Sequence, residues 1–203
     1  MIKNIIIIGL SVLLIVGNIL VTQNHRQHVR SLNSELRSYA ELISEISTKD
    51  KNAYKYNGVQ FQEIVLMDTL GVPRKISEIF TDETLILDIS NNNCSSCIEK
   101  ILPLFNNFYF ENMAIFYSGG NLRELNFFLR NNKVKHPVYF YQNTFRELPG
   151  DIENVPCFYI LSDELKLKNT YFPLKDESDF ITFYITRQLE LIKLSNRPIK
   201  SSN

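Results

Sequence analysis

The chain has 203 residues, and its 22 Lys and Arg balance its 22 Asp and Glu, so its formal net charge is zero with His neutral. This balance gives no electrostatic reason to expect nucleic acid or a strongly acidic partner. The length suits one domain with a proper core plus an appended segment. Three cysteines are too few for a scaffold held by disulfides, so the cysteine content favours redox chemistry over structural cross-linking.

The N-terminal segment Asn4–Thr22 is almost wholly apolar and carries no charge. It has about the length of a helix that crosses a bilayer, and neither a small-residue cleavage site nor a cysteine that could take a lipid follows it. We therefore predict an uncleaved membrane anchor over residues 1–24. Lys3 precedes the apolar run, whereas Arg26 and Arg30 follow it, so the charge distribution does not favour export of the C-terminal part.

Residues 25–58 are expected to form a helical stalk and a polar linker. Apolar side chains recur at spacings of three and four along the stalk: Val29, Leu32, Leu36, Tyr39, Ile43 and Ile46. This narrow stripe fits a short parallel coiled coil that would pair two chains through residues 29–46. A single helix lying on the globular domain, or a plain stalk, is the alternative, since the stripe covers fewer than three heptads.

Residues 59–195 are expected to form one α/β domain, followed by a tail at 196–203. Its strands alternate with helices and end in a hairpin before a last helix, which predicts a central mixed sheet with helices on both faces. The predicted strands are Val59–Met67, Val72–Ile76, Thr84–Ser90, Met113–Tyr117, Val138–Tyr141, Pro156–Leu161 and Leu165–Tyr171. The predicted helices are Ser77–Phe80, Ser95–Phe108, Asn121–Arg130 and Glu177–Leu194.

The motif Cys94-Ser95-Ser96-Cys97 stands where the buried strand Thr84–Ser90 gives way to a helix. A thiol at a helix start lies near unpaired backbone N–H groups and the positive end of the helix dipole, so its thiolate is favoured. A C-x-x-C among alternating strands and helices therefore indicates a dithiol that exchanges disulfides. Inert thiols or half of a metal site remain the alternative, although no second C-x-x-C completes a four-thiolate zinc site.

With these elements in place, the segment resembles the thioredoxin-like superfamily, specifically the membrane-anchored TlpA type of thiol-disulfide oxidoreductase. The C-x-x-C follows a buried strand and starts a helix that contains Pro103, Asp88 lies six residues before Cys94, and Val155-Pro156 precedes a strand and a hairpin. The N-terminal hairpin with Gly71 also looks like the one in this type. The chain departs from the family at Asn93, Ser95, Ser96 and Cys157, and Pro103 stands one residue further from the motif than is usual.

The resemblance implies roles for five residues. Cys94 would be the attacking thiolate, and Cys97 would resolve the mixed disulfide by attacking Cys94. Asp88 would be a buried carboxylate that accepts the proton of Cys97, unless the strand is out of phase and Asp88 faces water. Pro156 would be cis, which would leave the backbone of Val155 free to pair with an extended substrate. No metal and no cofactor other than the Cys94–Cys97 disulfide is expected.

Three further residue types carry weaker expectations. Cys157 is either a buried small hydrophobic residue or a third thiol that exchanges with the pair or joins a metal site. His136 is expected in a loop or in the core, because no other ligand stands at a matching spacing. Ser95 and Ser96 are expected to cap the helix.

The leading hypothesis is a single-pass protein of a bacterial inner membrane whose C-terminal domain faces the periplasm or another extracytoplasmic space, because disulfides form there. It would exchange disulfides with protein substrates through Cys94 and Cys97, with an upstream redox donor. One alternative is a thioredoxin-fold scaffold that presents a groove near Pro156 without turnover. Another is a copper or zinc chaperone that uses Cys94, Cys97 and Cys157.

Overall fold

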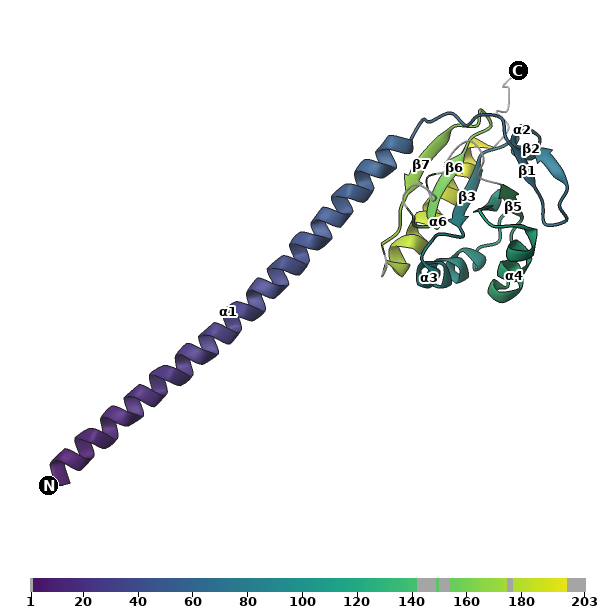
Figure 1. Ribbon diagram of the computed structural model, residues 1–203. Coiled ribbons are helices and arrows are strands. Elements are labelled where there is room, and N and C mark those ends of the chain that lie inside the picture. Colours follow the sequence, from purple (N-terminus) through teal and green to yellow (C-terminus); the bar gives the residue numbers. More distant parts are fainter. Residues whose placement is uncertain (1, 142–148, 150–153, 175–176, 197–203) are drawn as a thin grey trace, which may run out of the picture. The chain divides into compact units, whose positions relative to one another are not determined.

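The computed structural model describes residues 2–141, 149, 154–174 and 177–196, and for residues 2–21, 42, 45 and 49 only the backbone is described. The described chain forms two compact units, residues 1–48 and residues 49–203 (Figure 1). The predicted tail at 196–203 lies outside the described residues except for its first residue.

Helix α1 runs from Ile2 to Tyr56 and contains both the predicted anchor and the predicted stalk. The side chains of residues 2–21 lie outside the described ones, so the membrane anchor at Asn4–Thr22 stays a prediction. In the part of the chain that is described, no helix has the length and the apolar character needed to span a bilayer. The six apolar side chains of the stalk stripe are 40 to 66% exposed.

The last turns of α1 differ from the predicted linker. The sequence from Lys49 belongs to the second unit, and the helix continues to Tyr56, through most of the stretch predicted as a polar linker. Tyr56 is buried, and its ring centroid lies 5.9 Å from that of Phe172. Because this segment is mostly polar, the sequence did not identify Tyr56 as a residue buried in the second unit. Gly58, with φ at +80°, then turns the chain away from the helix.

The second unit is built on a seven-stranded mixed sheet with the strand order β2-β1-β5-β4-β3-β6-β7 (Figure 1). Strands β3, β4 and β5 are parallel to one another, whereas β6 is antiparallel to β3 and β7 is antiparallel to β6. The strands are β1 Val65–Met67, β2 Pro73–Lys75, β3 Thr84–Ser90, β4 Met113–Ser118, β5 Val138–Tyr141, β6 Cys157–Leu161 and β7 Leu167–Tyr171.

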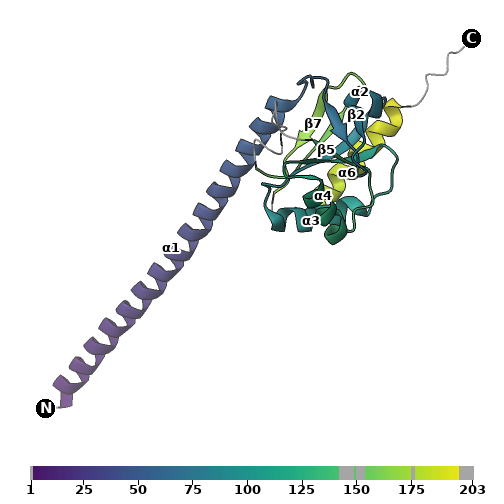
Figure 2. The same cartoon turned by 45° about the vertical axis from the view of Figure 1, so that its right-hand side comes forward.

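Two apolar clusters lie on the two faces of the sheet, because successive side chains of a strand point to opposite faces. On one face α3 (Ser95–Asn106), α4 (Leu122–Asn132) and α6 (Ser178–Ser195) cover Leu85, Leu87 and Ile89 of β3. Helices α3 and α4 lie side by side in both views (Figure 2). The other face is covered by the end of α1, by α2 (Ile76–Ile79) and by the segments beside them.

This topology is that of a thioredoxin-like fold, as the resemblance implied. A parallel β3-α3-β4 unit is followed by the antiparallel hairpin β6-β7 and the helix α6, and the hairpin lies beside β3. The predicted mixed sheet with helices on both faces is confirmed. The predicted N-terminal hairpin is also confirmed, since Val65 of β1 pairs with Lys75 of β2.

The first strand is shorter than predicted. Only Val65–Met67 pairs in the hairpin, whereas the expected strand began at Val59. Backbone hydrogen bonds instead join Val59 to Leu167 and Phe61 to Leu165, so this stretch runs beside the start of β7. An extended, half-apolar sequence can pair either with β2 or with the stretch before β7. Contacts between segments distant in the chain decide which pairing forms.

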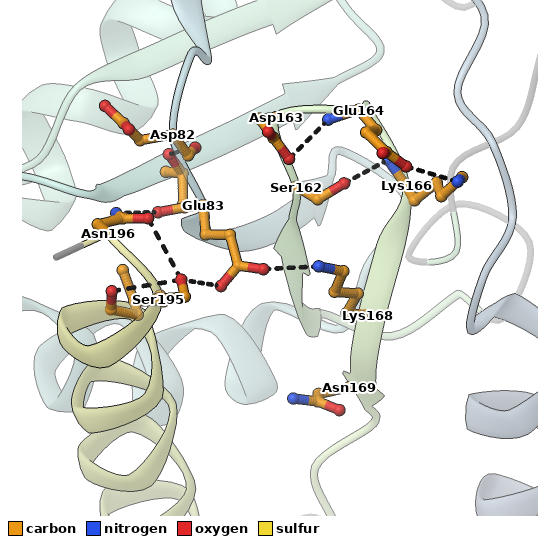
Figure 3. Close-up of polar contacts among 12 residues, drawn as sticks. Asp82, Glu83, Ser162, Asp163, Glu164, Lys166, Lys168, Asn169, Ser195 and Asn196 are labelled. Carbon is orange, nitrogen blue, oxygen red and sulfur yellow. Dashed lines mark hydrogen bonds and ion pairs between the residues drawn. The ribbon is translucent and has the colours of Figure 1, made fainter. Parts of the chain in front are cut away.

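A polar cluster around Glu83 ties the start of β3 to β7 and to the end of α6 (Figure 3). The Glu83 carboxylate accepts hydrogen bonds from Lys168 at 2.6 Å and from the Ser195 hydroxyl at 2.5 Å. Burial raises the pKa of Glu83, but these two partners outweigh burial and hold the pKa below its ordinary value. The cluster therefore stabilises the end of the sheet remote from the C-x-x-C motif.

Candidate active site

A tight turn between β3 and α3 places Cys94. The side-chain oxygen of Asn93 accepts a hydrogen bond from the Ser90 N–H at 2.6 Å, and the Asn93 N–H donates to the Ser90 carbonyl at 3.0 Å. Asn91 donates its N–H to the carbonyl of Ser118 in β4. Asn93 is buried, so the residue that departs from the family pattern fixes the turn. Asparagine is a frequent turn residue, so the sequence carried a signal for this role, but Asn93 was predicted only as a departure from the family pattern.

Cys94 is the N-cap residue of α3, and its carbonyl accepts from the N–H groups of Cys97 at 3.0 Å and Ile98 at 3.1 Å. Its side chain is exposed, and its Sγ lies 3.0 Å from the Ser96 Oγ. Hydrogen bonds from the Cys97 and Ser96 side chains and from their backbone N–H groups lower the pKa of the Cys94 thiol from 9.0 to about 7. Around neutral pH a substantial part of the thiol is therefore thiolate, the nucleophilic form.

The three cysteines are free thiols with graded exposure: Cys94 is exposed, Cys97 is partly buried and Cys157 is buried. An incoming disulfide can reach Cys94, while Cys97 lies one helical turn further on. This grading fits an attacking and a resolving thiol. Within the described residues no three or more His, Cys, Asp or Glu side chains gather to hold a metal ion, so the three cysteines do not form the metal-binding group that the chaperone alternative requires.

Asp88 is completely buried, as predicted, and the alternative in which it faces water is wrong. It stands opposite Cys157 in the pairing of β3 with β6, and the Cys157 thiol donates to Asp88 Oδ2 at a sulfur–oxygen distance of 3.7 Å. Both residues lie on the face of the sheet opposite to the apolar side of α3. The structure thus joins Asp88 to Cys157, and the role of Asp88 as proton acceptor for Cys97 stays a prediction.

The predicted cis bond before Pro156 is wrong, because the described residues contain no cis peptide bond. The trans form is the ordinary state of an X-Pro bond, and here Asn154, with φ at +58°, turns the chain just before β6. Pro156 is buried and Val155 is partly buried. Their predicted contact with an extended substrate stays a prediction.

The two serines do not cap α3 as predicted. Cys94 itself occupies the N-cap position, and the Ser96 hydroxyl contacts the Cys94 sulfur. The prediction for His136 is confirmed, since its ring is buried, its Nε2 lies 3.2 Å from the Phe105 carbonyl oxygen, and burial lowers its pKa.

A groove of about 860 Å³ opens beside the start of α3, and the sequence did not reveal it. One wall comes from the turn and the first turns of α3, and the other comes from β4 and α4. Phe127 of α4 lines the groove and is 69% exposed. The signal available in the sequence was Phe127 itself, an aromatic residue on the polar side of an amphipathic helix. Ser95 and Ile98 of α3 line the groove opposite Phe127.

The chain is similar, at low sequence identity, to several solved structures. No family model matches the chain, and no curated protein matches it in sequence. A putative thiol:disulfide interchange protein DsbE from Chlorobium tepidum is 12% identical, with a TM-score of 0.49 over 67% of this chain and 96% of that chain. Peroxidoxin BcpB from Mycobacterium tuberculosis is 13% identical, with a TM-score of 0.48 over 70% and 99%. A putative protein disulfide isomerase from Bacteroides thetaiotaomicron is 14% identical, with a TM-score of 0.47 over 68% and 90%. The fold assignment rests on the strand order and pairing given above.

Proposed function

We propose that this protein is a thiol-disulfide oxidoreductase that exchanges disulfides with protein substrates through Cys94 and Cys97. The observation that carries the proposal is the exposed Cys94 thiol at the start of α3, whose pKa is lowered to about 7 by Cys97 and Ser96. Such a thiol is partly ionised at neutral pH, open to a large partner and followed one turn later by a second thiol.

In the reducing direction the Cys94 thiolate attacks one sulfur of a substrate disulfide. A bond forms between Cys94 and that sulfur, and the other substrate sulfur leaves as a thiolate. Cys97 then gives up its proton and attacks the Cys94 sulfur, which releases the second substrate thiolate and leaves a Cys94–Cys97 disulfide. The substrate gains two electrons and the dithiol loses two. In the oxidising direction the same steps run in reverse.

Three other parts of the site support this chemistry in our proposal. Asp88, completely buried near the end of β3, accepts the proton that Cys97 loses. Val155 and Pro156, which precede β6, contact the substrate chain while Cys94 holds its sulfur. The groove lined by Ser95, Ile98 and Phe127 gives the substrate additional surface next to the reacting thiol.

The setting of the domain is also a proposal. The apolar run Asn4–Thr22 would anchor the chain in a bacterial inner membrane, with the domain on the extracytoplasmic side, where an upstream redox donor would restore the dithiol. The exposed stripe from Val29 to Ile46 has alternating spacings of three and four, which is the repeat of a coiled-coil seam and supports a homodimer through the stalk. Cross-linking of the full chain in membranes would test that dimer.

Reduction of insulin by the full chain tests the function. We expect wild-type protein, supplied with a chemical reductant, to accelerate the reduction, and Cys94→Ser to lose the acceleration. The variant should keep the thermal unfolding temperature of the wild type, because Cys94 is exposed and serine differs from cysteine only by oxygen in place of sulfur. Equal rates for the two folded proteins would favour the scaffold alternative and contradict the proposal.

A further inference from the structure

Cys157 has no part in the exchange steps, yet it occupies a specific place. It is the first residue of β6, it stands opposite Asp88 in the register with β3, and neither side chain has any exposed surface. Its thiol donates to Asp88 Oδ2 at 3.7 Å. No substrate can reach a thiol buried in this way, so its chemistry is limited to what it does to the carboxylate.

The hydrogen bond acts on the ionisation of the carboxylate. Removing a carboxylate from water favours its protonated form, whereas a hydrogen bond donated to the charged form favours ionisation. A thiol is a weak donor, and Asp88 is out of contact with solvent. The same geometry keeps Cys157 protonated, since a thiolate at this distance from a carboxylate would place two negative charges together.

Among the described residues, several tyrosine hydroxyls lie in or beside the buried cluster that contains Cys157. Tyr141 and Tyr159 belong to the same buried cluster as Cys157, and Tyr56 and Tyr139 pack in it as well. Tyr184 of α6 interacts electrostatically with Cys157, and burial raises its pKa. Burial also raises the pKa of Tyr139. The two tyrosines with raised pKa values stay neutral in the range where a carboxylate titrates. Cys97, at the start of α3, is the group that the proposed reaction couples to Asp88.

We infer that Cys157 is a positioning residue that keeps Asp88 ionised and thereby sets the lower end of the pH range in which the dithiol exchanges disulfides. This inference rests on the proposed function, because it assumes that Asp88 accepts the proton of Cys97. A carboxylate that is already protonated cannot take that proton, so loss of the Cys157 donor would move the onset of resolution to higher pH.

Infrared spectroscopy of the full chain measures directly whether Cys157 keeps Asp88 ionised. The carbonyl band of the protonated carboxylic acid is assigned with Asp88→Asn and followed against pH. We expect Cys157→Ala to raise the midpoint of Asp88 ionisation by about half a pH unit, because the weak hydrogen bond that the thiol donates to the carboxylate is lost. Cys157→Ser, with a stronger donor, should move the midpoint below that of the wild type. Coincident midpoints for wild type and Cys157→Ala would overturn the inference.

The pH profile of insulin reduction tests whether Cys157 sets the lower pH limit of disulfide exchange. Cys157→Ala should shift the acidic limb upward by the same amount, and it should have no further effect on the profile in an Asp88→Asn background. If Cys157→Ala does not fold, Cys157→Ser decides, and a midpoint at or above the wild-type value contradicts the inference. A wild type that shows no exchange at any pH would refute the proposed function, whereas normal exchange with unchanged infrared midpoints would refute only the role of Cys157.

Discussion

The Ser96 hydroxyl oxygen lies 3.0 Å from the Cys94 sulfur across the first turn of α3. Ser96 therefore acts on the thiol and not on the helix end, where a serine is more often found. Together with the thiol of Cys97 and the backbone N–H groups of both residues, it holds the pKa of Cys94 at about 7. Ser96, one of the two residues between the cysteines, thus tunes the nucleophile in this chain.

Alkylation of Cys94 should follow this pKa. Its thiolate fraction rises with pH, so the rate of reaction with iodoacetamide should increase and reach half of its plateau near pH 7, where an unperturbed thiol would do so near 9.0. Mass spectrometry of the folded protein should place the first adduct on Cys94. A midpoint close to 9 would show that the hydrogen bonds to the sulfur do not form in solution.

Ser96→Ala removes one donor to the thiolate and should raise the pKa of Cys94, which lowers the thiolate fraction and the alkylation rate at pH 7. One neutral donor is worth roughly half a pH unit to one pH unit. Ser95→Ala is the matched control, since the Ser95 side chain is not among the groups that lower the pKa of Cys94. Equal shifts in the two variants would assign the effect to the helix start in general.

Gly119→Ala should disturb the turn that carries Cys94. Gly119 follows β4 with φ at +81°, and an added Cβ would collide with the side chain of Asn91, which lies in the turn after β3. Gly58 has nearly the same φ, +80°, with nothing within 4 Å of an added Cβ. Gly58→Ala should therefore cost only the left-handed backbone, roughly 1 to 2 kcal/mol.

The measurement is urea unfolding of both variants, with insulin reduction at neutral pH. Gly119→Ala should lose more stability than Gly58→Ala and should also slow the reduction, while Gly58→Ala should leave the rate unchanged. Identical losses in the two variants would mean that Asn91 moves aside without consequence for the turn.

The Glu83 cluster predicts a pH dependence of stability. Because the folded pKa of Glu83 is lower than its ordinary value of 4.5, its contribution is present above 4.5 and is lost as the pH falls through the folded pKa. Glu83→Gln should lower the free energy of unfolding by roughly 1 kcal/mol at pH 7, and the gap to the wild type should close in acid. Glu164→Gln, which breaks an exposed pair with Lys166, should have little effect. A gap that persists at acid pH would point to lost packing instead.

Much of the fold follows from local signals in the sequence. The strand Thr84–Ser90 and the strand Val138–Tyr141 have the predicted limits, since each is a short apolar or aromatic run with clear borders. The helix α4 begins after Asn121 as predicted, because the Asn121 side chain accepts from the N–H groups of Arg123 and Glu124.

The features that the sequence did not predict depend on contacts between segments that are distant in the chain. The contact of Asp88 with Cys157 follows from the register of β6 on β3, across 69 positions of the chain. The groove beside α3 forms only because α4 lies next to α3. The first strand is shorter than predicted, and Val59 and Phe61 hydrogen-bond to Leu167 and Leu165 instead of extending it. The cis bond at Pro156 was transferred from the resemblance alone, and this chain turns at Asn154 instead.

The central claim is that Cys94 attacks and Cys97 resolves, and trapping of the mixed disulfide tests it most directly. Full-length Cys97→Ser is mixed with a peptide that contains a disulfide, quenched in acid and digested for mass spectrometry. We predict a stable adduct of the peptide on Cys94, whereas wild-type protein releases the reduced peptide and forms the Cys94–Cys97 disulfide. Absence of an adduct, or an adduct on Cys157, would contradict the account.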